Sequence, residues 1–239
     1  MTGAGGALTV GAMLSDSRRF SRLVAAFSLV AAPLLVLAGM AATPWEDEAT
    51  TAAYHDSLAG HPDQAQIAAL LLHFGFLLLL PASLGLMHLA RGAAPKLAHA
   101  GGLLAVFGLA TLPGLLITDF YDLALAEGLP RAQSVPISDA ALGSWGAALL
   151  SVSAALPAIF GMIVLAIAAW RAGAAPGWTA LLVAAGWLVP FGGEVGLLLS
   201  VIGATLLTAG LAWIGLAVAR MDDQAWAERA FVRAPVAYA

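Results

Sequence analysis

The stretch QIAALLLHFGFLLLLPASLGLMHLA, residues 66–90, determines which class of fold this chain can adopt. It is almost wholly apolar, and as a single helix it is long enough to cross a hydrocarbon core about 30 Å thick. Its titratable groups are His73, well inside the stretch, and His88, near its end. The sequence therefore predicts a membrane-spanning helix here, with further helices of the same kind built around it.

The composition of the whole chain indicates a membrane protein. Hydrophobic residues make up 61% and charged residues 10% of the 239 residues, against about 45–50% and 25% in soluble domains. A mean hydropathy of +0.91 implies a surface too apolar to stay dispersed in water. No basic patch suited to nucleic acid is present in the sequence. The absence of cysteine excludes disulfides, thiolate metal sites, iron–sulfur clusters and cysteine catalysis.

Six apolar segments separated by polar loops predict an all-α bundle of six transmembrane helices in one domain, residues 1–239. Short tails, residues 1–22 and 220–239, precede the first helix and follow the last. Loops 43–65 and 124–140 lie on one side of the membrane, the second as an irregular or partly helical segment. The expected helices are Leu23–Ala42, Gln66–Ala90, Leu97–Leu123, Ala141–Trp170, the short Trp178–Phe191, and Val195–Ala219.

The positions of the basic residues predict the orientation of this bundle. With six helices, all of the ten Lys and Arg residues except Arg131 fall on the side of the two termini. Short loops rich in Lys and Arg remain in the cytoplasm. We therefore expect both termini to be cytoplasmic and the acidic loop 43–65 to form part of an extracytoplasmic cap.

Two segments of the chain resemble known sequences. RGAAPKLAHAGGLLAVFGLA, residues 91–110, and AAWRAGAAPGWTALLVAAGWLVP, residues 168–190, are similar to a broad set of uncharacterised, small, Ala/Leu-rich multi-pass membrane proteins of high-GC bacteria. The resemblance extends over about the second to the sixth helix. It implies a multi-pass protein of the inner (plasma) membrane and supplies no functional residues.

Small residues mark a packing seam on the last expected helix. Gly196, Gly203 and Gly210 recur every seventh residue. Small side chains allow helix backbones to approach closely, and in lipid this approach is a main source of helix association. The pattern predicts a seam that packs either within the chain or against a partner helix.

Candidate site residues lie toward the outer ends of the expected helices. His73 is about two turns below the outer end of its helix. Asp119 and Asp122 are three residues apart at the outer end of the third helix, and Glu194 lies in the turn before the last. Imidazole and carboxylate groups at one depth are suited to bind a divalent cation or to relay protons. The alternative is that the carboxylates lie at the water interface and that His73 hydrogen-bonds a neighbouring backbone group.

Other chemistries remain as alternatives. His73 and His88 near the two ends of one helix, with His99 as a partner for His88, suit a haem- or metal-binding redox protein. No other expected helix supplies a histidine to pair with His73, so no cofactor is assigned. The chain has neither a GxSxG nor an HExxH motif; this favours a protein that is not an enzyme and leaves the question open.

The leading hypothesis is a small transport-type or accessory membrane protein. In it His73, Asp119 and Asp122, with Glu194 as a weaker candidate, form a proton- or cation-responsive site in the outer leaflet. Because the helices carry few polar groups, a proton, a cation or a lipophilic small molecule is favoured over a sugar or an amino acid. The alternatives are the redox protein above and a structural subunit of a larger complex, recognised through the glycine seam.

Overall fold

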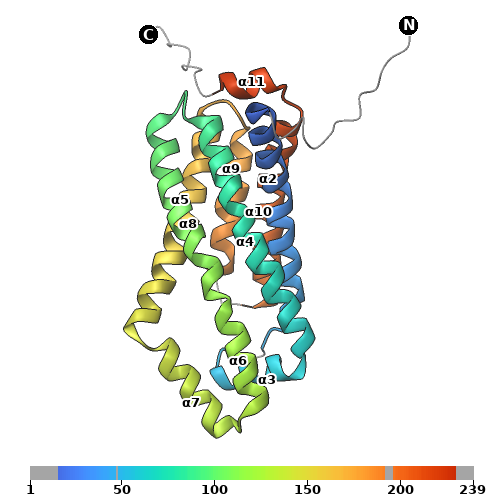
Figure 1. Ribbon diagram of the computed structural model, residues 1–239, viewed down its shortest axis with the longest axis vertical. Helices are drawn as coiled ribbons and strands as arrows, with labels where there is room; N and C mark the ends of the chain where they lie inside the picture. Colours follow the sequence, from blue (N-terminus) through green and yellow to red (C-terminus); the bar gives the residue numbers. More distant parts are fainter. Residues whose placement is uncertain (1–15, 47, 192–195, 230–239) are drawn as a thin grey trace, which may run out of the picture.

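The fold is known from a computed structural model that describes residues 16–46, 48–191 and 196–229. Within these residues every regular element is a helix and no strand occurs (Figure 1). The helices are α2 (Ser17–Ala42), α3 (Thr51–Gly60), α4 (Pro62–Ala90), α5 (Pro95–Leu115), α6 (Ile117–Gly128), α7 (Arg131–Leu142), α8 (Trp145–Arg171), α9 (Gly177–Leu188), the 3-10 turn η1 (Val189–Phe191), α10 (Leu197–Ala219) and α11 (Asp223–Glu228).

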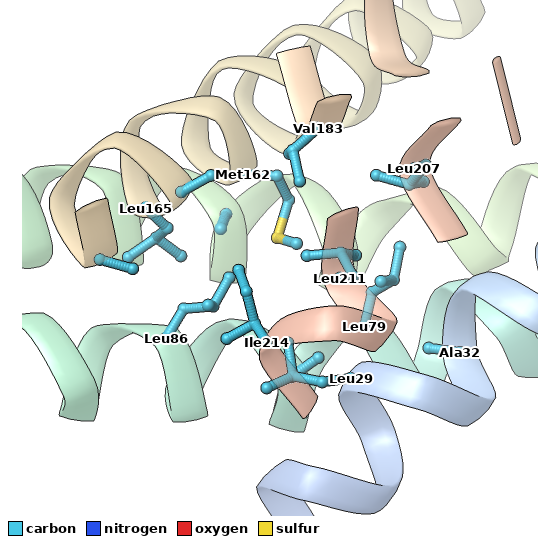
Figure 2. Close-up of a cluster of buried hydrophobic side chains, with 14 of the residues drawn as sticks. Leu29, Ala32, Leu79, Leu86, Met162, Leu165, Val183, Leu207, Leu211 and Ile214 are labelled. Atoms are coloured by element: carbon cyan, nitrogen blue, oxygen red, sulfur yellow. The ribbon is translucent and has the colours of Figure 1, made fainter. Parts of the chain in front are cut away.

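Six of these helices form a closed bundle. α2 packs between α4 and α10, α4 packs on α5, and α5 packs on α8; α9 closes the ring because it contacts both α8 and α10. The interior is filled by apolar side chains from all sides of the ring, including Leu79, Met162, Leu211 and Ile214 (Figure 2). Their burial stabilises the arrangement through close packing.

The outer surface of the bundle is suited to lipid. Leu103, Leu181 and Leu198 are 75%, 72% and 72% exposed. Such an apolar surface aggregates in water but is stable in contact with lipid hydrocarbon. Five helical segments in the described part of the chain are long and apolar enough to cross a membrane. These are Ser17–Ala42, Pro62–Ala90, Pro95–Gly128, Trp145–Arg171 and Leu197–Ala219.

The sixth expected span is shorter than the others. α9 is apolar but has 12 residues, which rise by about 18 Å. The chain then tightens into η1 at Val189–Phe191. Six spans, and the side of the membrane on which the termini lie, therefore remain predictions.

The third expected helix is divided in two. α5 ends at Leu115 and α6 begins at Ile117, shortly after Pro113. Proline has no backbone N–H, and its ring crowds the preceding turn, so it favours a break at this point. Beyond the break, α6 extends past the end of the bundle (Figure 1) and carries Asp119 and Asp122.

Glycine allows the closest helix contact in the bundle, between α5 and α8. A Cβ added at Gly161 would lie 2.2 Å from the backbone nitrogen of Ala105, and one added at Gly108 would lie 2.2 Å from that of Ala158. Backbone therefore touches backbone at both points, as in the small-residue interfaces of membrane helices.

The glycines of the expected seam differ in their surroundings. A Cβ added at Gly203 would lie 2.8 Å from the Gly186 carbonyl oxygen, and one added at Gly210 would lie 3.0 Å from the Thr179 carbonyl oxygen. Both glycines therefore face α9 of the same chain. At Gly196, an added Cβ would have no described atom within 4 Å.

The two long loops contain additional helices. α3 lies within the expected loop 43–65, and α7 covers most of the loop 124–140. Together with α6 they form a layer at one end of the bundle (Figure 1). This layer of α3, α6 and α7 is called the cap below. Contacts of α3 with α6 and α7, and of α6 with α4, hold it in place.

The opposite end of the bundle is closed by α11. Arg22 of α2 is buried, and its Nε lies 2.7 Å from the Asp223 carboxylate. Trp226 is 2% exposed, donates from its indole Nε1 to the Ser21 hydroxyl at 3.0 Å, and stacks on His88. The described part of the polar tail expected after residue 219 is thus anchored to the bundle through α11.

Candidate functional site

The candidate site is a buried polar network inside the cap. Its centre is His55 of α3, which is 2% exposed. The Nδ1 atom of His55 lies 3.1 Å from the Ser134 hydroxyl of α7, and Nε2 lies 3.5 Å from the Asp122 carboxylate of α6. One imidazole therefore joins three helices, α3, α6 and α7.

Local sequence places each of these groups. The Thr50 hydroxyl caps α3 by accepting from the Ala53 N–H, which fixes the start of the helix that carries His55. Ser134 and Ser138 are four residues apart on α7, so they share one face. The Ser138 hydroxyl donates to Asp122 Oδ1 at 2.7 Å. The Asp122 carboxylate is thus held between a serine hydroxyl and the imidazole.

The His55 ring is not fully satisfied in this arrangement. Nε2 is buried and has no hydrogen-bond partner among the described residues. The Asp122 carboxylate that it faces is 3.5 Å away, too far for a well-formed hydrogen bond but close enough for an ion pair with a charged ring. A buried polar atom in this state has a free-energy cost.

A second polar pair lies beside the first. The Tyr54 hydroxyl donates to Asp119 Oδ1 at 3.0 Å. Burial, followed by the nearby Asp119 carboxylate, raises the pKa of the Tyr54 phenol far above its usual range. Tyr54 therefore stays a neutral donor at every physiological pH and joins α3 to α6 through Asp119.

The outer rim of the cap carries exposed charges. Arg131 of α7 forms an ion pair with Asp56 of α3. Both line a cleft of about 570 Å³ whose wall also includes Glu46, Glu48 and His61. The exposed pair contributes little to stability, so the cap is held mainly by its buried polar and apolar contacts.

The residues predicted from sequence are distributed over three places. His73 lies in the bundle, where its Nδ1 is 3.2 Å from the Pro113 carbonyl oxygen. Asp119 and Asp122 lie in the cap, bonded to the groups described above, and Glu194 lies outside the described residues. In the described part of the chain, no three His, Cys, Asp or Glu side chains are grouped so that they could hold a metal ion. The cation role of this set stays a prediction.

The hydrogen bond made by His73 is related to the helix break after Pro113. α5 ends two residues after Pro113, so the Pro113 carbonyl lies in the last turn, where helix carbonyls have no intrahelical N–H. The imidazole supplies a donor to this carbonyl. His73 thus makes the backbone hydrogen bond that was the alternative interpretation of the sequence.

His88, the other histidine of α4, is also engaged in packing. Its ring stacks on the Trp226 indole with the centroids 4.2 Å apart, and its Nε2 lies 2.8 Å from the Trp226 carbonyl oxygen. Haem ligation by this nitrogen would require α11 to move away from the bundle.

Sequence reasoning did not select His55, Ser134 or Ser138 as site residues. His55 is separated from Asp122 by most of the chain's first half, and no local pattern links the two. The spacing of Ser134 and Ser138 was a usable signal, because two serines four residues apart on a helix form a polar stripe. That signal required α7 to be recognised as a helix.

The network contains serine, histidine and aspartate, the residue types of a hydrolytic triad. Ser134 and Ser138 are each 1% exposed, so a substrate carbonyl has no access to either hydroxyl. The arrangement instead brings an imidazole, a carboxylate and two hydroxyl groups together at a point where three helices meet. No family model, curated protein or solved structure matches this chain, so the interpretation of the site rests on its geometry.

Proposed function

We propose that this protein is a small transport-type or accessory membrane protein whose extracytoplasmic cap closes when His55 is protonated. The observation that carries the proposal is the position of His55, buried against Asp122 with an unsatisfied Nε2. Imidazole is the side chain that ordinarily gains and loses a proton between pH 5 and 8. The proposal keeps Asp119 and Asp122 as the carboxylates of the site and assigns the imidazole to His55 in place of His73.

Protonation changes the force between α3 and α6. A charged imidazolium 3.5 Å from the Asp122 carboxylate gains about 5 kcal/mol of attraction at an effective dielectric constant near 20. The cost of burying the charges offsets part of this gain. Loss of the proton leaves a buried carboxylate facing a neutral ring, so the contact between α3 and α6 is weakened.

The other charged groups around His55 are consistent with this switch. On α6, Asp122 faces the ring directly, while Asp119 is bonded to the neutral Tyr54 phenol. On α3 and α7, Asp56 and Arg131 neutralise one another at the rim. Asp122 is therefore the carboxylate that faces the His55 ring directly.

The cap covers a region of the bundle that suits a permeation or sensing role. A cavity of about 230 Å³ beneath it is lined by groups from α2, α3, α4 and α6, including Met40, Leu58, Ala65 and Asp119. Separation of α3 from α6 would connect this cavity to the cap side. The cap is the natural point at which external pH controls access to it.

Thiol labelling tests the proposal, because the chain contains no cysteine. Ala65→Cys places one thiol under Leu58 of α3 and Leu123 of α6, where the native residue is 6% exposed. Gln66→Cys, one residue further along α4 and exposed, is the matched reference. Both thiols are labelled with a membrane-impermeant maleimide. Dividing the labelling rate of Ala65→Cys by that of Gln66→Cys cancels the effect of pH on thiol reactivity itself.

We expect the labelling of Ala65→Cys, relative to Gln66→Cys, to rise about tenfold between pH 5 and pH 8, the change that a linkage of about 1.4 kcal/mol produces. When His55→Asn is combined with Ala65→Cys, the asparagine keeps an acceptor for the Ser134 hydroxyl but has no ring to titrate. The rise in labelling with pH should then disappear. A ratio that is constant with pH, or an equal rise in the His55→Asn background, would show that His55 does not control the cap.

A further inference from the structure

The cavity of about 230 Å³ beneath the cap has a wall of mixed chemistry. Most of its lining residues are apolar, among them Leu58 of α3 and Leu72 of α4. Two acidic residues, Glu46 and Asp119, also line the cavity, whereas no Lys, Arg or His among the described residues does so. The described wall therefore contains acidic groups and no basic group.

The two carboxylates of this wall have no cation beside them. Asp119 Oδ1 accepts from the Tyr54 hydroxyl at 3.0 Å, and this neutral phenol supplies a hydrogen bond but no charge. None of the ion pairs among the described residues includes Asp119 or Glu46. An ionised carboxylate in a mainly apolar wall is costly unless a cation lies next to it. The wall is therefore complementary to a ligand with a positive charge.

Two aromatic side chains make the wall suited to an organic cation. Trp45 and Tyr54 both line the cavity, and the indole Nε1 of Trp45 donates to the Met40 carbonyl oxygen at 3.0 Å, which fixes its ring. Aromatic rings attract alkylammonium groups, and quaternary ammonium ligands are typically bound in this way. In the described part of the chain, no three His, Cys, Asp or Glu side chains are grouped to hold a metal ion. An ammonium ion with alkyl groups therefore matches this wall better than a metal ion.

We propose that this cavity binds a small organic ammonium ion, with its charge neutralised by Asp119 and Glu46 and its alkyl groups against the apolar and aromatic wall. A cavity of about 150 Å³ holds a benzene molecule, so the volume suffices for an ammonium group with several short alkyl groups. A phospholipid head group is disfavoured, because the same carboxylates would repel its phosphate. The inference rests on the proposed function, since it names the ligand whose access the cap would control.

The cleft at the rim of the cap provides an approach for such a ligand. Trp45 and Glu46 line both this cleft and the cavity, so the two spaces share a wall. Glu48 adds a further carboxylate to the cleft, while Asp56 is paired with Arg131. A cleft with an excess of one charge raises the local concentration of the opposite ion. An organic cation is therefore attracted to the side on which the cap would open.

The test is calorimetric titration of the detergent-purified, full-length protein at pH 8 with choline, a small trimethylammonium alcohol. Its analogue 3,3-dimethyl-1-butanol has the same shape without the charge, and phosphocholine adds the phosphate of a lipid head group. We expect choline to bind about tenfold more tightly than either, because neither analogue carries a net positive charge.

Asp119→Asn keeps an acceptor for the Tyr54 hydroxyl but removes the charge, so it should weaken choline binding about tenfold. Asp63→Asn is the matched control and should bind choline as tightly as the wild type does. It removes an exposed carboxylate of α4 that lines neither the cavity nor the cleft.

Two further measurements keep the proposal testable if Asp119→Asn does not fold. Glu46→Gln should weaken choline binding about threefold, the effect of removing a partly exposed charge. The thiol of Ala65→Cys lies in the wall of the cavity. Saturating choline should therefore slow its labelling by maleimide at pH 8, relative to the labelling of Gln66→Cys.

Several results would overturn the inference. One is choline binding that is undetectable or no tighter than that of the neutral analogue, and another is an equal affinity for choline in the two carboxylate variants and Asp63→Asn. Phosphocholine that binds as tightly as choline would identify a lipid head group as the ligand instead. Unchanged labelling of Ala65→Cys in saturating choline would place the ligand outside the cavity.

Failure of this inference is distinguishable from failure of the cap proposal, because the titrations are made at one pH with His55 and Asp122 unchanged. Choline binding together with Ala65→Cys labelling that is constant with pH would refute the cap proposal alone. Absence of choline binding together with pH-dependent labelling would refute this inference alone.

Discussion

Gly161→Ala in the contact between α5 and α8 gives the sharpest prediction about the fold. The added methyl group would lie 2.2 Å from the nitrogen and 2.6 Å from the Cα of Ala105. Favourable carbon contacts begin at about 3.5 Å, so the two helices must separate by roughly 1 Å. The obstructing atoms are backbone and have no rotamer by which to move aside.

The magnitude follows from two opposing terms. Overpacking a well-filled interface costs about 1–3 kcal/mol, and a backbone clash belongs at the upper end of that range. Replacing glycine by alanine within a helix stabilises the helix by up to about 1 kcal/mol. We therefore expect Gly161→Ala to lower the free energy of unfolding by about 2 kcal/mol, or about 4–8 °C in Tm for a chain of this size.

Gly114→Ala is the matched control, because it lies on α5 and an added Cβ would have no described atom within 4 Å. It should leave Tm unchanged or raise it slightly. The assay is thermal unfolding of detergent-purified protein, followed by loss of the monodisperse peak in size-exclusion chromatography. A Gly161→Ala protein that melts within 1 °C of the wild type, or a Gly114→Ala protein destabilised to the same extent, would refute the packing argument.

Further predictions address the two ends of the molecule. Arg22→Gln should lower the stability by about 1–3 kcal/mol in the same melting assay, because it leaves the partly buried Asp223 carboxylate without its cation. Asp122→Asn should abolish the pH dependence of Ala65→Cys labelling, since no charge then faces the imidazole. His73→Ala should preserve that pH dependence, because the His73 ring is hydrogen-bonded to the backbone of α5. Loss of the pH dependence in this variant would show that His73 is part of the site. In intact cells, Gln66→Cys should react with impermeant maleimide, and protection of this thiol would reverse the proposed orientation.

Hydropathy predicted the bundle well, because burial in lipid demands long apolar helices whatever their neighbours. α2, α4, α8 and α10 follow the expected ranges closely. The break between α5 and α6 was not predicted. Prolines also lie within α2, α4 and α8 without ending them, so proline alone does not tell which helix is interrupted.

The candidate site was predicted only in part, for a different reason. Asp119 and Asp122 were selected as costly charges at the end of an apolar helix, and both are in the cap network. Their partners Tyr54 and His55 come from a polar loop whose helix has no marked apolar face. Pairing between two loops depends on how the bundle brings their ends together, and no periodicity in the sequence carries that information.

The most direct test of the central claim is the position of α3 relative to the bundle as a function of pH. Spin labels on Ala59→Cys of α3 and Leu149→Cys of α8, both at exposed positions, report this distance by double electron–electron resonance. We predict one narrow distance distribution at pH 5 and a second, displaced population at pH 8 that is already present at both pH values in His55→Asn. Identical distributions at pH 5 and pH 8 in the otherwise wild-type protein would contradict the account.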